Sequence, residues 1–295
     1  MARDGLSVVA KATLILERFL TERTTSLGFN EILSGTGLSR ATAHRLLADM
    51  TAHGLLSQDA RRDEYRLGPL LLSTGELARH SIGLAEVAAP RLEALRDEFG
   101  ETTLLAELHG GSVVPIRRLD GLHEMRMSQE VGRRYPAYAG ATGQVLLAHL
   151  RPEELAAYLA RVELVPLTDD TIRSPAGLRS VLGRVRGAGV GVSVGERVPD
   201  AIAISAPVFD RDGSLAGALT VSGVAGRWDR GLIERAARAV KAAAEAVSGE
   251  LGAPLATASP GAADLEDPGS EASALLAQAC DEAASKIDQQ PRATR

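Results

Sequence analysis

The first amphipathic pattern of the chain runs through residues 7–20, where apolar side chains recur at spacings of three and four. This spacing places them on one face of an α-helix, and Ser7 is suited to cap its N-terminus. The residues of the stripe are Val9, Ala12, Leu16 and Phe19. We therefore predict an N-terminal helix that packs through this face.

Two shorter helical patterns follow, over residues 31–36 and 40–53, and each is bounded by residues that favour helix ends. A Ser or Asn side chain can accept a hydrogen bond from a free backbone N–H at a helix start, and glycine commonly ends a helix. The expected N-caps are Asn30 and Ser39, and the expected stops are Gly37 and Gly54.

The segment after the third helix has the pattern of a β-hairpin. Residues 55–57 and 65–67 favour short strands, and a charged turn separates them. A helix, a second helix, a tight turn, a third helix and a hairpin form the outline of a winged helix-turn-helix. The pattern predicts such a domain over residues 5–67.

Behind Gly68 the pattern changes. Residues 68–82 favour a linker helix, and residues 83–252 alternate between helical patterns and short β-like runs with Gly-rich turns. The expected helices are 84–99, 141–150, 152–160, 176–187 and 229–251, and the expected strands are 103–109, 112–119, 124–131, 189–197, 201–210 and 215–224. Runs of strands with helices between them favour an antiparallel sheet covered by helices, an α+β fold.

Residues 253–295 are rich in Ala, Ser, Pro, Gly and acidic residues, with few side chains that can build a core. This composition predicts a mostly disordered tail, in which residues 271–287 favour a weak helix.

Composition places the chain in a reducing compartment. Cys280 is its only cysteine, which excludes a disulfide framework within the chain. The N-terminus lacks the apolar core of a signal peptide, and no apolar run reaches the length of about 18 residues that a spanning helix needs. We expect a cytoplasmic protein with no membrane partner.

The charge distribution leaves the N-terminal segment free to meet DNA, although the net charge of the whole chain is −5. Residues 1–66 hold nine Arg or Lys and eight Asp or Glu, whereas residues 253–295 hold three and seven. The acidic excess therefore lies behind the predicted DNA-binding domain.

The third helix has an apolar stripe on one face and small or basic residues on the other. The stripe consists of Ala43, Leu46, Leu47 and Met50, and the opposite face holds Ala41, Arg45 and Ala48, with His44 beside them. Arg45 can donate two hydrogen bonds to the O6 and N7 atoms of guanine, and Ala41 can contact a thymine methyl group. This face is suited to the major groove.

Positions at the start of the same helix are suited to DNA as well. Arg40 and Thr42 project from the first turn, and the free N–H groups behind Ser39 favour a phosphate. In the hairpin, Arg62, with Arg61 and Arg66, can follow the neighbouring backbone as a wing. The alternative is a winged-helix protein-interaction module in which Arg45 is a solvated surface charge.

A series of motifs then points to a known family. In the first part these are Glu31-Ile32, Thr36 to Ser39, Thr42 to Leu47, Gly54-Leu55 and Tyr65 to Gly68; behind it they are Glu101-Thr102, Leu105-Ala106, Ala139 to Ala148, Leu167-Thr168, Thr171-Ile172, Arg186 to Gly189, Gly195-Glu196, Ala206 to Asp210 and Val221 to Gly223. In this order they resemble the IclR family of bacterial transcriptional regulators over residues 5–251. The resemblance implies a DNA-binding repressor or activator with a GAF-like effector domain at residues 83–252.

The resemblance also implies an effector cavity on one face of the sheet. Its lining would be Met127, Ala141, Thr142, Ser193, Ala203, Thr220 and Ser222. Thr142 opens a predicted helix, whose first N–H groups can hold a carboxylate, and Thr220 and Ser222 alternate on one face of a strand. A small organic acid is the implied effector. Ser193 and Ala203 stand where some members have Asp and Cys, so the identity of the acid does not transfer.

Other chemistry has little support in the sequence. Residues 191–195 match the G-x-S-x-G pattern of serine hydrolases, but a strand pattern follows Ser193 and no histidine comes after His149. The six histidines lack metal-ligand spacing. We expect no cofactor, no metal and no catalytic residue, so an enzyme is the least favoured class. The expected partners are double-stranded DNA, a small carboxylate and a second copy of the chain, in a dimer or tetramer, because a two-fold pair reads two half-sites.

Overall fold

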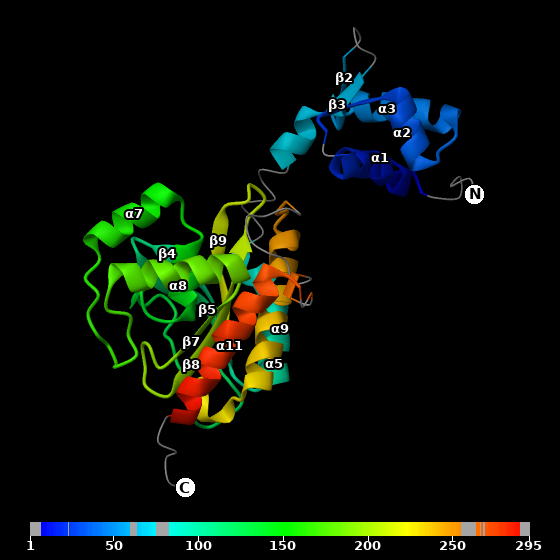
Figure 1. The fold of residues 1–295 in the computed structure, drawn as a ribbon. Helices are drawn as coiled ribbons and strands as arrows, with labels where there is room; N and C mark the ends of the chain where they lie inside the picture. Colours follow the sequence, from blue (N-terminus) through cyan, green and yellow to red (C-terminus); the bar gives the residue numbers. More distant parts are fainter. Residues whose placement is uncertain are drawn as a thin grey trace. The chain divides into compact units, whose positions relative to one another are not determined.

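The computed structural model describes residues 7–22, 24–59, 64–74, 83–254, 264–265, 267 and 269–289. The chain divides into two compact units, residues 1–82 and 83–295 (Figure 1). No helix within the described ranges combines the length and the apolar character needed to cross a membrane.

The first unit is a three-helix domain with a small sheet. Its elements are α1 (Val8–Glu22), β1 (Ser26–Gly28), α2 (Phe29–Thr36), α3 (Arg40–Ala52), β2 (Leu56–Asp59) and β3 (Glu64–Leu67). The strands are antiparallel in the order β1-β3-β2. This arrangement confirms the winged helix-turn-helix. Residues 69–74 are helical, and residues 75–82 of the expected linker helix lie outside the described residues.

The apolar stripe of α3 is confirmed, and that of α1 is partly wrong. All four stripe residues of α3 are buried against α1 and α2. In α1 the buried positions are Ile15 and Phe19, whereas Val9 is 75% exposed. Val9 lies in the first turn of α1, and the core of this unit begins only at Ala12, one turn later.

The start of α2 also differs from the expected one. Gly28, not Asn30, is its N-cap, and the Glu31 carboxylate accepts a hydrogen bond from the Gly28 N–H at 2.7 Å. The residues before it form β1, a strand that the sequence analysis did not predict, and this strand pairs with β3. The pairing partner is about forty residues away in the chain, beyond the reach of a local pattern.

The second unit is built on a six-stranded antiparallel sheet in the order β6-β5-β4-β9-β8-β7. Its strands are β4 (Thr102–His109), β5 (Ser112–Leu119), β6 (Tyr135–Pro136), β7 (Gly191–Val194), β8 (Ala201–Phe209) and β9 (Leu215–Val224). Its helices are α5 (Leu84–Phe99), α6 (Ala141–Ala148), α7 (Pro152–Arg161), α8 (Pro175–Ala188), α9 (Arg230–Glu250) and α11 (Glu271–Gln289), with a short 3-10 turn, η1 (Ala225–Arg227).

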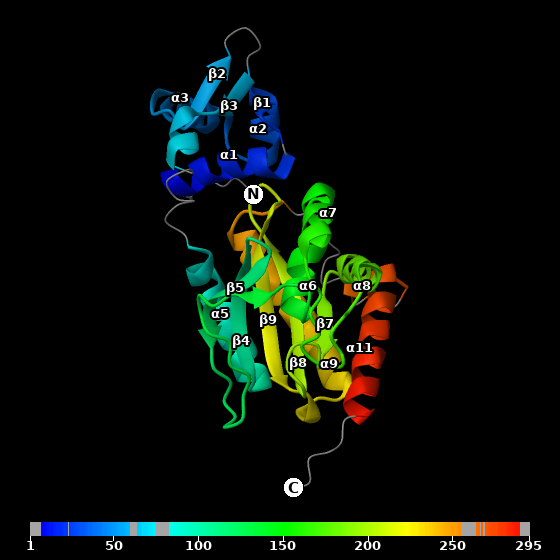
Figure 2. The same cartoon turned by 90° about the vertical axis from the view of Figure 1, so that its left-hand side faces the viewer.

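Helices cover both faces of this sheet (Figure 2). Leu105 and Leu219 face α5 and α9, whereas their neighbours Leu104 and Ala218 face α6 and α8. Successive side chains of a strand point to opposite faces, so the two-sided burial explains the nearly continuous apolar runs of these strands. The α+β fold is confirmed.

One expected strand is absent: residues 124–131 form no strand in the structure. Side-chain hydrogen bonds hold this segment instead of strand pairing. Thr102 Oγ1 donates to the Met127 carbonyl at 2.7 Å, and Arg118 donates to the Gln129 carbonyl at 3.0 Å.

The C-terminal segment differs most from expectation. The helix expected over residues 271–287 is present as the nineteen-residue α11, whereas the prediction of a disordered tail is wrong for this part, because α11 is packed against the unit. This helix packs against α8, α9 and β7, and it buries Ala272, Leu276 and Cys280 in the core of the unit. Alanine-rich composition supplies helix propensity, and the contacts with α8, α9 and β7 supply the burial that the tail alone lacks.

Candidate DNA-binding and effector-binding sites

The first turn of α3 is capped by its own neighbour. Ser39 has extended backbone, and its Oγ accepts a hydrogen bond from the Thr42 N–H at 3.4 Å and donates one to the Thr42 hydroxyl oxygen at 2.8 Å. This confirms Ser39 as the N-cap. It also leaves the N-terminus of α3 at the surface, with its positive end toward solvent.

The face of α3 opposite the core is exposed. Arg40, Ala41, His44 and Arg45 are exposed, and Thr42 is half-buried. Because the opposite face of α3 is packed in the core, these side chains all point away from the core of the unit. They form a surface with two arginines and one small residue, suited to the major groove.

The structure adds Phe29, which the sequence reasoning missed. The ring of Phe29, at the start of α2, stacks on the His44 ring with centroids 4.0 Å apart, and the Arg40 guanidinium carbon lies 5.1 Å from its centroid. Phe29 is therefore a platform that orders two side chains of the α3 surface. A lone aromatic residue before a short helix gave no signal of this role.

The predicted wing is described only in part. Arg62 and Arg61 lie outside the described residues, so no contact is assigned to them. Arg66 is exposed on β3 and pairs with Asp59 at 3.9 Å.

In the second unit, the N-terminus of α6 is buried and capped from another part of the chain. Ser193 of β7 accepts a hydrogen bond from the Ala141 N–H at 2.8 Å. Gly140 has φ +95°, which only glycine adopts readily, and this turn brings α6 onto the sheet. All eight residues of α6 are buried.

The hydroxyl groups expected around this helix end come together in the structure. Thr142 Oγ1 lies 3.0 Å from Thr220 Oγ1, which lies 2.8 Å from the Ser205 hydroxyl. Ala203 pairs with Ser193 on one side and with Ser222 on the other, which forms a cross-strand row on the same face of the sheet. Six of the seven predicted lining residues therefore gather at one end of α6.

The seventh, Met127, is placed differently. Its side chain is half-buried, and it joins the group through the bond from Thr102 to its carbonyl. Gln129 and Tyr135 line the small cavity at the start of α6. Its volume is about 30 Å³, so an organic acid needs the lining to move before it fits.

Two ionisable residues of this site escaped the sequence reasoning. The buried Glu196 carboxylate accepts hydrogen bonds from the Gly140 N–H at 3.1 Å and from the Gln144 side chain at 2.6 Å. Burial raises the pKa of Glu196, and these two hydrogen bonds oppose the rise. Arg197 lines the cavity with its guanidinium carbon 4.7 Å from the Tyr135 ring centroid. Burial lowers the pKa of Arg197, and no carboxylate in the described part of the chain offsets this.

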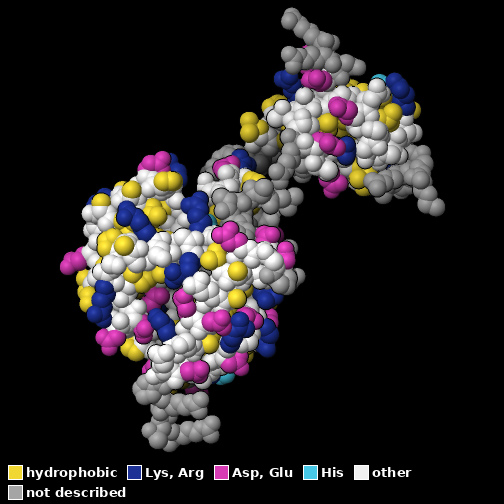
Figure 3. All heavy atoms as spheres, in the orientation of Figure 1, with side chains coloured by type: hydrophobic (Ala, Val, Ile, Leu, Met, Phe, Trp, Pro, Cys, Tyr) yellow, Lys and Arg dark blue, Asp and Glu magenta, His cyan; other side chains and the backbone are white. Residues whose placement is uncertain are grey.

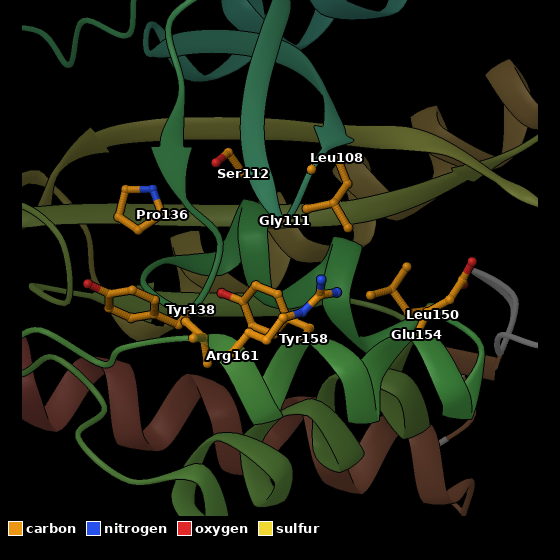
Figure 4. Close-up of a pocket in the computed structure, with 11 residues that line it drawn as sticks. Leu108, Gly111, Ser112, Pro136, Tyr138, Leu150, Glu154, Tyr158 and Arg161 are labelled. Carbon is orange, nitrogen blue, oxygen red and sulfur yellow. The ribbon is translucent and has the colours of Figure 1, made fainter.

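A separate, larger cavity of about 630 Å³ lies between the β4–β5 turn and α7 (Figure 4). Tyr138, Tyr158 and Arg161 line it, and none of the predicted effector residues does. Tyr138 donates its hydroxyl hydrogen to the Val165 carbonyl at 3.0 Å, so it presents a ring to this cavity.

The hydrolase-like motif has no hydrolase geometry. Ser193 lies inside β7, not on a strand-to-helix turn, and its Oγ is occupied by the Ala141 N–H.

Comparisons with known proteins identify the family. Residues 8–60 match the IclR helix-turn-helix domain, and residues 77–249 match the bacterial transcriptional regulator IclR C-terminal domain. The chain belongs to the IclR family of HTH-type transcriptional regulators.

Individual relatives agree with this assignment. The HTH-type transcriptional regulator KipR of Bacillus subtilis (strain 168) is 30% identical over 244 residues, which cover 83% of this chain and 96% of that protein. The Agobacterium tumefaciens repressor BlcR has a similar structure, with a TM-score of 0.74, 25% identity and coverage of 84% of this chain and 98% of the other. An IclR homolog from Microbacterium hydrocarbonoxydans, crystallised with 4-hydroxybenzoate, gives a TM-score of 0.51 and 27% identity, with 83% and 99% coverage.

Proposed function

We propose that this regulator reads operator DNA with the exposed face of α3 and binds a small organic acid at the N-terminus of α6. The observation that supports the DNA contact best is the two-sided character of α3. One face is fully buried, and the other presents Arg40 and Arg45 without a covering element from its own unit. A packed helix with an exposed basic face holds the geometry that groove recognition requires.

The acid is supported by the charge of the α6 site. Arg197 lines the same cavity as Thr142, and the positive end of α6 lies beside them. The relative crystallised with 4-hydroxybenzoate holds an aromatic hydroxy acid, which agrees with a carboxylate ligand here. The present cavity is too small for such an acid, so its lining must move on binding. The acid then either displaces Arg197 from Tyr135 or lies against both side chains.

Regulation then requires that the acid binds two arrangements of the protein with different affinity. We propose that the regulator acts as a dimer or tetramer, since two α3 helices related by a two-fold axis would read two half-sites. The alternative is a winged-helix interaction module that does not bind specific DNA.

The DNA-binding proposal is tested by fluorescence anisotropy on the DNA upstream of the gene for this chain. Arg45→Ala should cost about 1–3 kcal/mol of specific binding and relax the choice of base at one position. Arg66→Ala is the control, because loss of a phosphate contact should weaken binding to all sequences alike and lower the salt dependence of binding. Binding that is insensitive to both changes, or equal on unrelated DNA, would favour the interaction module.

The effector proposal is tested by thermal shift with a panel of small carboxylates that includes 4-hydroxybenzoate. Thr142→Val and Arg197→Gln should weaken any hit, and loss of the charged hydrogen bond of Arg197 should cost about 1.5–3 kcal/mol. Arg161→Gln in the cavity of Figure 4 is the matched control. A hit that is lost only in Arg161→Gln would move the effector to that cavity and overturn the α6 assignment.

A further inference from the structure

The helix α11 lies outside both family matches, which cover residues 8–60 and 77–249, yet it is part of the second unit. It lies along the edge strand β7 and contacts α8 and α9, the helices on the two faces of the sheet. It therefore contacts three elements of this unit at one edge of the sheet (Figures 1 and 2).

Ion pairs fix α11 to different neighbours. Asp281 pairs with Arg230 at the start of α9, and Glu282 pairs with Arg184 of α8 at 3.6 Å. Near its C-terminal end, Lys286 pairs with Asp170 at 3.0 Å. Acidic and basic side chains are interspersed on the visible face of this unit (Figure 3).

The turn at residues 168–171 connects Lys286 to the α6 site, because Lys286 pairs with Asp170 in this turn. Thr171, next to Asp170, donates its hydroxyl hydrogen to the Glu196 carbonyl at 2.7 Å, and Thr168 makes a second bond to the same oxygen at 3.2 Å. The Asp170 carboxylate also lies against Gly195, where a Cβ would be 2.6 Å from its oxygen. The turn at residues 168–171 therefore holds the backbone of Glu196.

Glu196 in turn holds the start of α6, since its carboxylate accepts the Gly140 N–H and the Gln144 amide. The same end of α6 lines the cavity with Arg197 and Thr142. An unbroken series of contacts thus leads from Lys286 to the N-terminus of α6.

The packing of α11 is light. Of its four buried residues only Leu276 is large, and a cavity of about 150 Å³ remains between α11, α8 and β7. This pocket leaves part of α11 without close-packed neighbours, so we infer that the helix is held less firmly than the layers of the sheet. A weakly docked helix is one whose attachment a ligand can shift.

We propose that α11 is a strap whose docking is coupled to the effector cavity. In the docked state it holds the 168–171 turn and Glu196 against α6, and when it detaches the N-terminus of α6 loosens. The coupling itself is a property of the folded chain; only its consequence for ligand affinity rests on the proposed function.

Cys280 reports the docked state, because it is the only cysteine of the chain, is 0% exposed and lies in the α11 contact. Burial raises the pKa of its thiol to about 12, which keeps it unreactive while α11 is docked. Ala283→Glu places a charge in the buried face of α11 and should detach it. We expect Cys280 labelling by a disulfide reagent to rise about tenfold or more.

Hydrogen exchange then tests the coupling. In Ala283→Glu the amides of Gly140 and Ala141 should exchange about tenfold faster, while those of β4 stay protected and show that the unit is folded. Fast labelling of Cys280 with unchanged exchange at Gly140 and Ala141 would overturn the proposal.

Lys286→Ala and Asp281→Ala form a milder pair in case Ala283→Glu disturbs the whole unit. Each removes one ion pair of α11, but only Lys286 reaches the 168–171 turn. Lys286→Ala should raise exchange at Gly140 and Ala141 by about two- to fivefold, and Asp281→Ala should leave it unchanged. Equal exchange in the two variants contradicts the coupling.

A ligand arm uses 4-hydroxybenzoate as the probe. If it binds, and if Ala283→Glu detaches α11 fully, the factor by which this variant weakens binding should equal the factor by which saturating acid slows Cys280 labelling in the unchanged chain, because coupling is reciprocal. Unequal factors contradict the proposal. Failure of the acid to bind concerns only the proposed effector, since the exchange measurements decide the coupling without a ligand.

Discussion

The helices α3 and α6 each have a serine that accepts a hydrogen bond from their first turn, but the two serines come from different places. In α3 it is Ser39, the residue before the helix, with a bond of 3.4 Å at the surface. In α6 it is Ser193, 52 positions away on β7, with a bond of 2.8 Å in the interior. The end of α3 is exposed, as the proposed DNA contact requires, whereas the buried end of α6 must rearrange if it is to bind the proposed small acid.

The difference explains why the sequence predicts the surroundings of one helix end better than those of the other. For a surface helix with a local cap, the cap, the buried stripe and the exposed face all lie within about fifteen consecutive residues and can be predicted from them. A buried helix end is defined by strands far away in sequence, so its neighbours appear only once the sheet has formed.

The largest effect should come from removing a core leucine in each helix. Leu47→Ala in α3 and Leu146→Ala in α6 each empty a fully buried site and should cost about 2–5 kcal/mol. Trp228, the only tryptophan, is buried in the second unit, so its fluorescence during urea unfolding reports that unit. Leu146→Ala should shift this transition, and Leu47→Ala should abolish DNA binding without shifting it. An equal shift in both variants would mean that the two units unfold together.

A pH effect of similar size should come from the other end of α6. Burial lowers the pKa of His149 to about 4, and Arg186 and Lys241 act in the same direction. The unfolded chain therefore takes up a proton between pH 6.5 and 4 that the folded chain refuses, and stability falls across this window by about 3 kcal/mol. His149→Gln should flatten the fall, as measured by urea unfolding at pH 7 and pH 4.5. Parallel pH profiles for the two proteins would contradict the lowered pKa.

Glu196, at the start of α6, should change the stability of the protein with pH in the opposite direction to His149. Burial raises its pKa, so the folded chain binds the proton more readily and the contribution of Glu196 to stability falls as pH rises through the raised pKa. Glu196→Gln should therefore make the stability of the protein less sensitive to this rise in pH, which the same urea series measures. An unchanged profile would show that the hydrogen bonds at Glu196 cancel the effect of its burial.

Replacement of the two capping serines should lower the free energy of unfolding by different amounts. Ser193→Ala leaves the Ala141 N–H unpaired in the interior and should cost about 1–3 kcal/mol in the Trp228-detected transition. Ser39→Ala exposes the Thr42 N–H to water and should cost about 0.5–1 kcal/mol, at the low end for caps, as measured by circular dichroism of the first unit. A larger cost for Ser39→Ala would reverse the comparison.

The smallest effect should come from Phe29→Leu. The change keeps an apolar side chain in the core but removes the ring that orders His44 and Arg40. DNA affinity should fall by about 0.5–1 kcal/mol, with the unfolding of the first unit nearly unchanged. Unaltered affinity, measured beside Arg45→Ala, would show that Phe29 does not organise the DNA-binding face.

Several features could be predicted from the sequence because they depend on neighbours within one or two helical turns. These include the extent of α3, its cap at Ser39 and its buried stripe. The gathering of Ala141, Thr142, Ser193, Ala203, Thr220 and Ser222 was implied only by resemblance to the IclR family, and the structure brings them to one end of α6. Their contacts with an effector remain predictions.

The sequence by itself determined the winged helix-turn-helix, the α+β class and the family, because periodicity, caps and motif order are local or linear properties. Only the tertiary structure decided that Glu196 accepts hydrogen bonds at the start of α6, that Arg197 lines the small cavity there and that α11 packs into the second unit. The physical reason is that each depends on burial. A carboxylate, a guanidinium and an alanine-rich helix look like solvated surface in a linear pattern, and they acquire a role only where folding removes them from water.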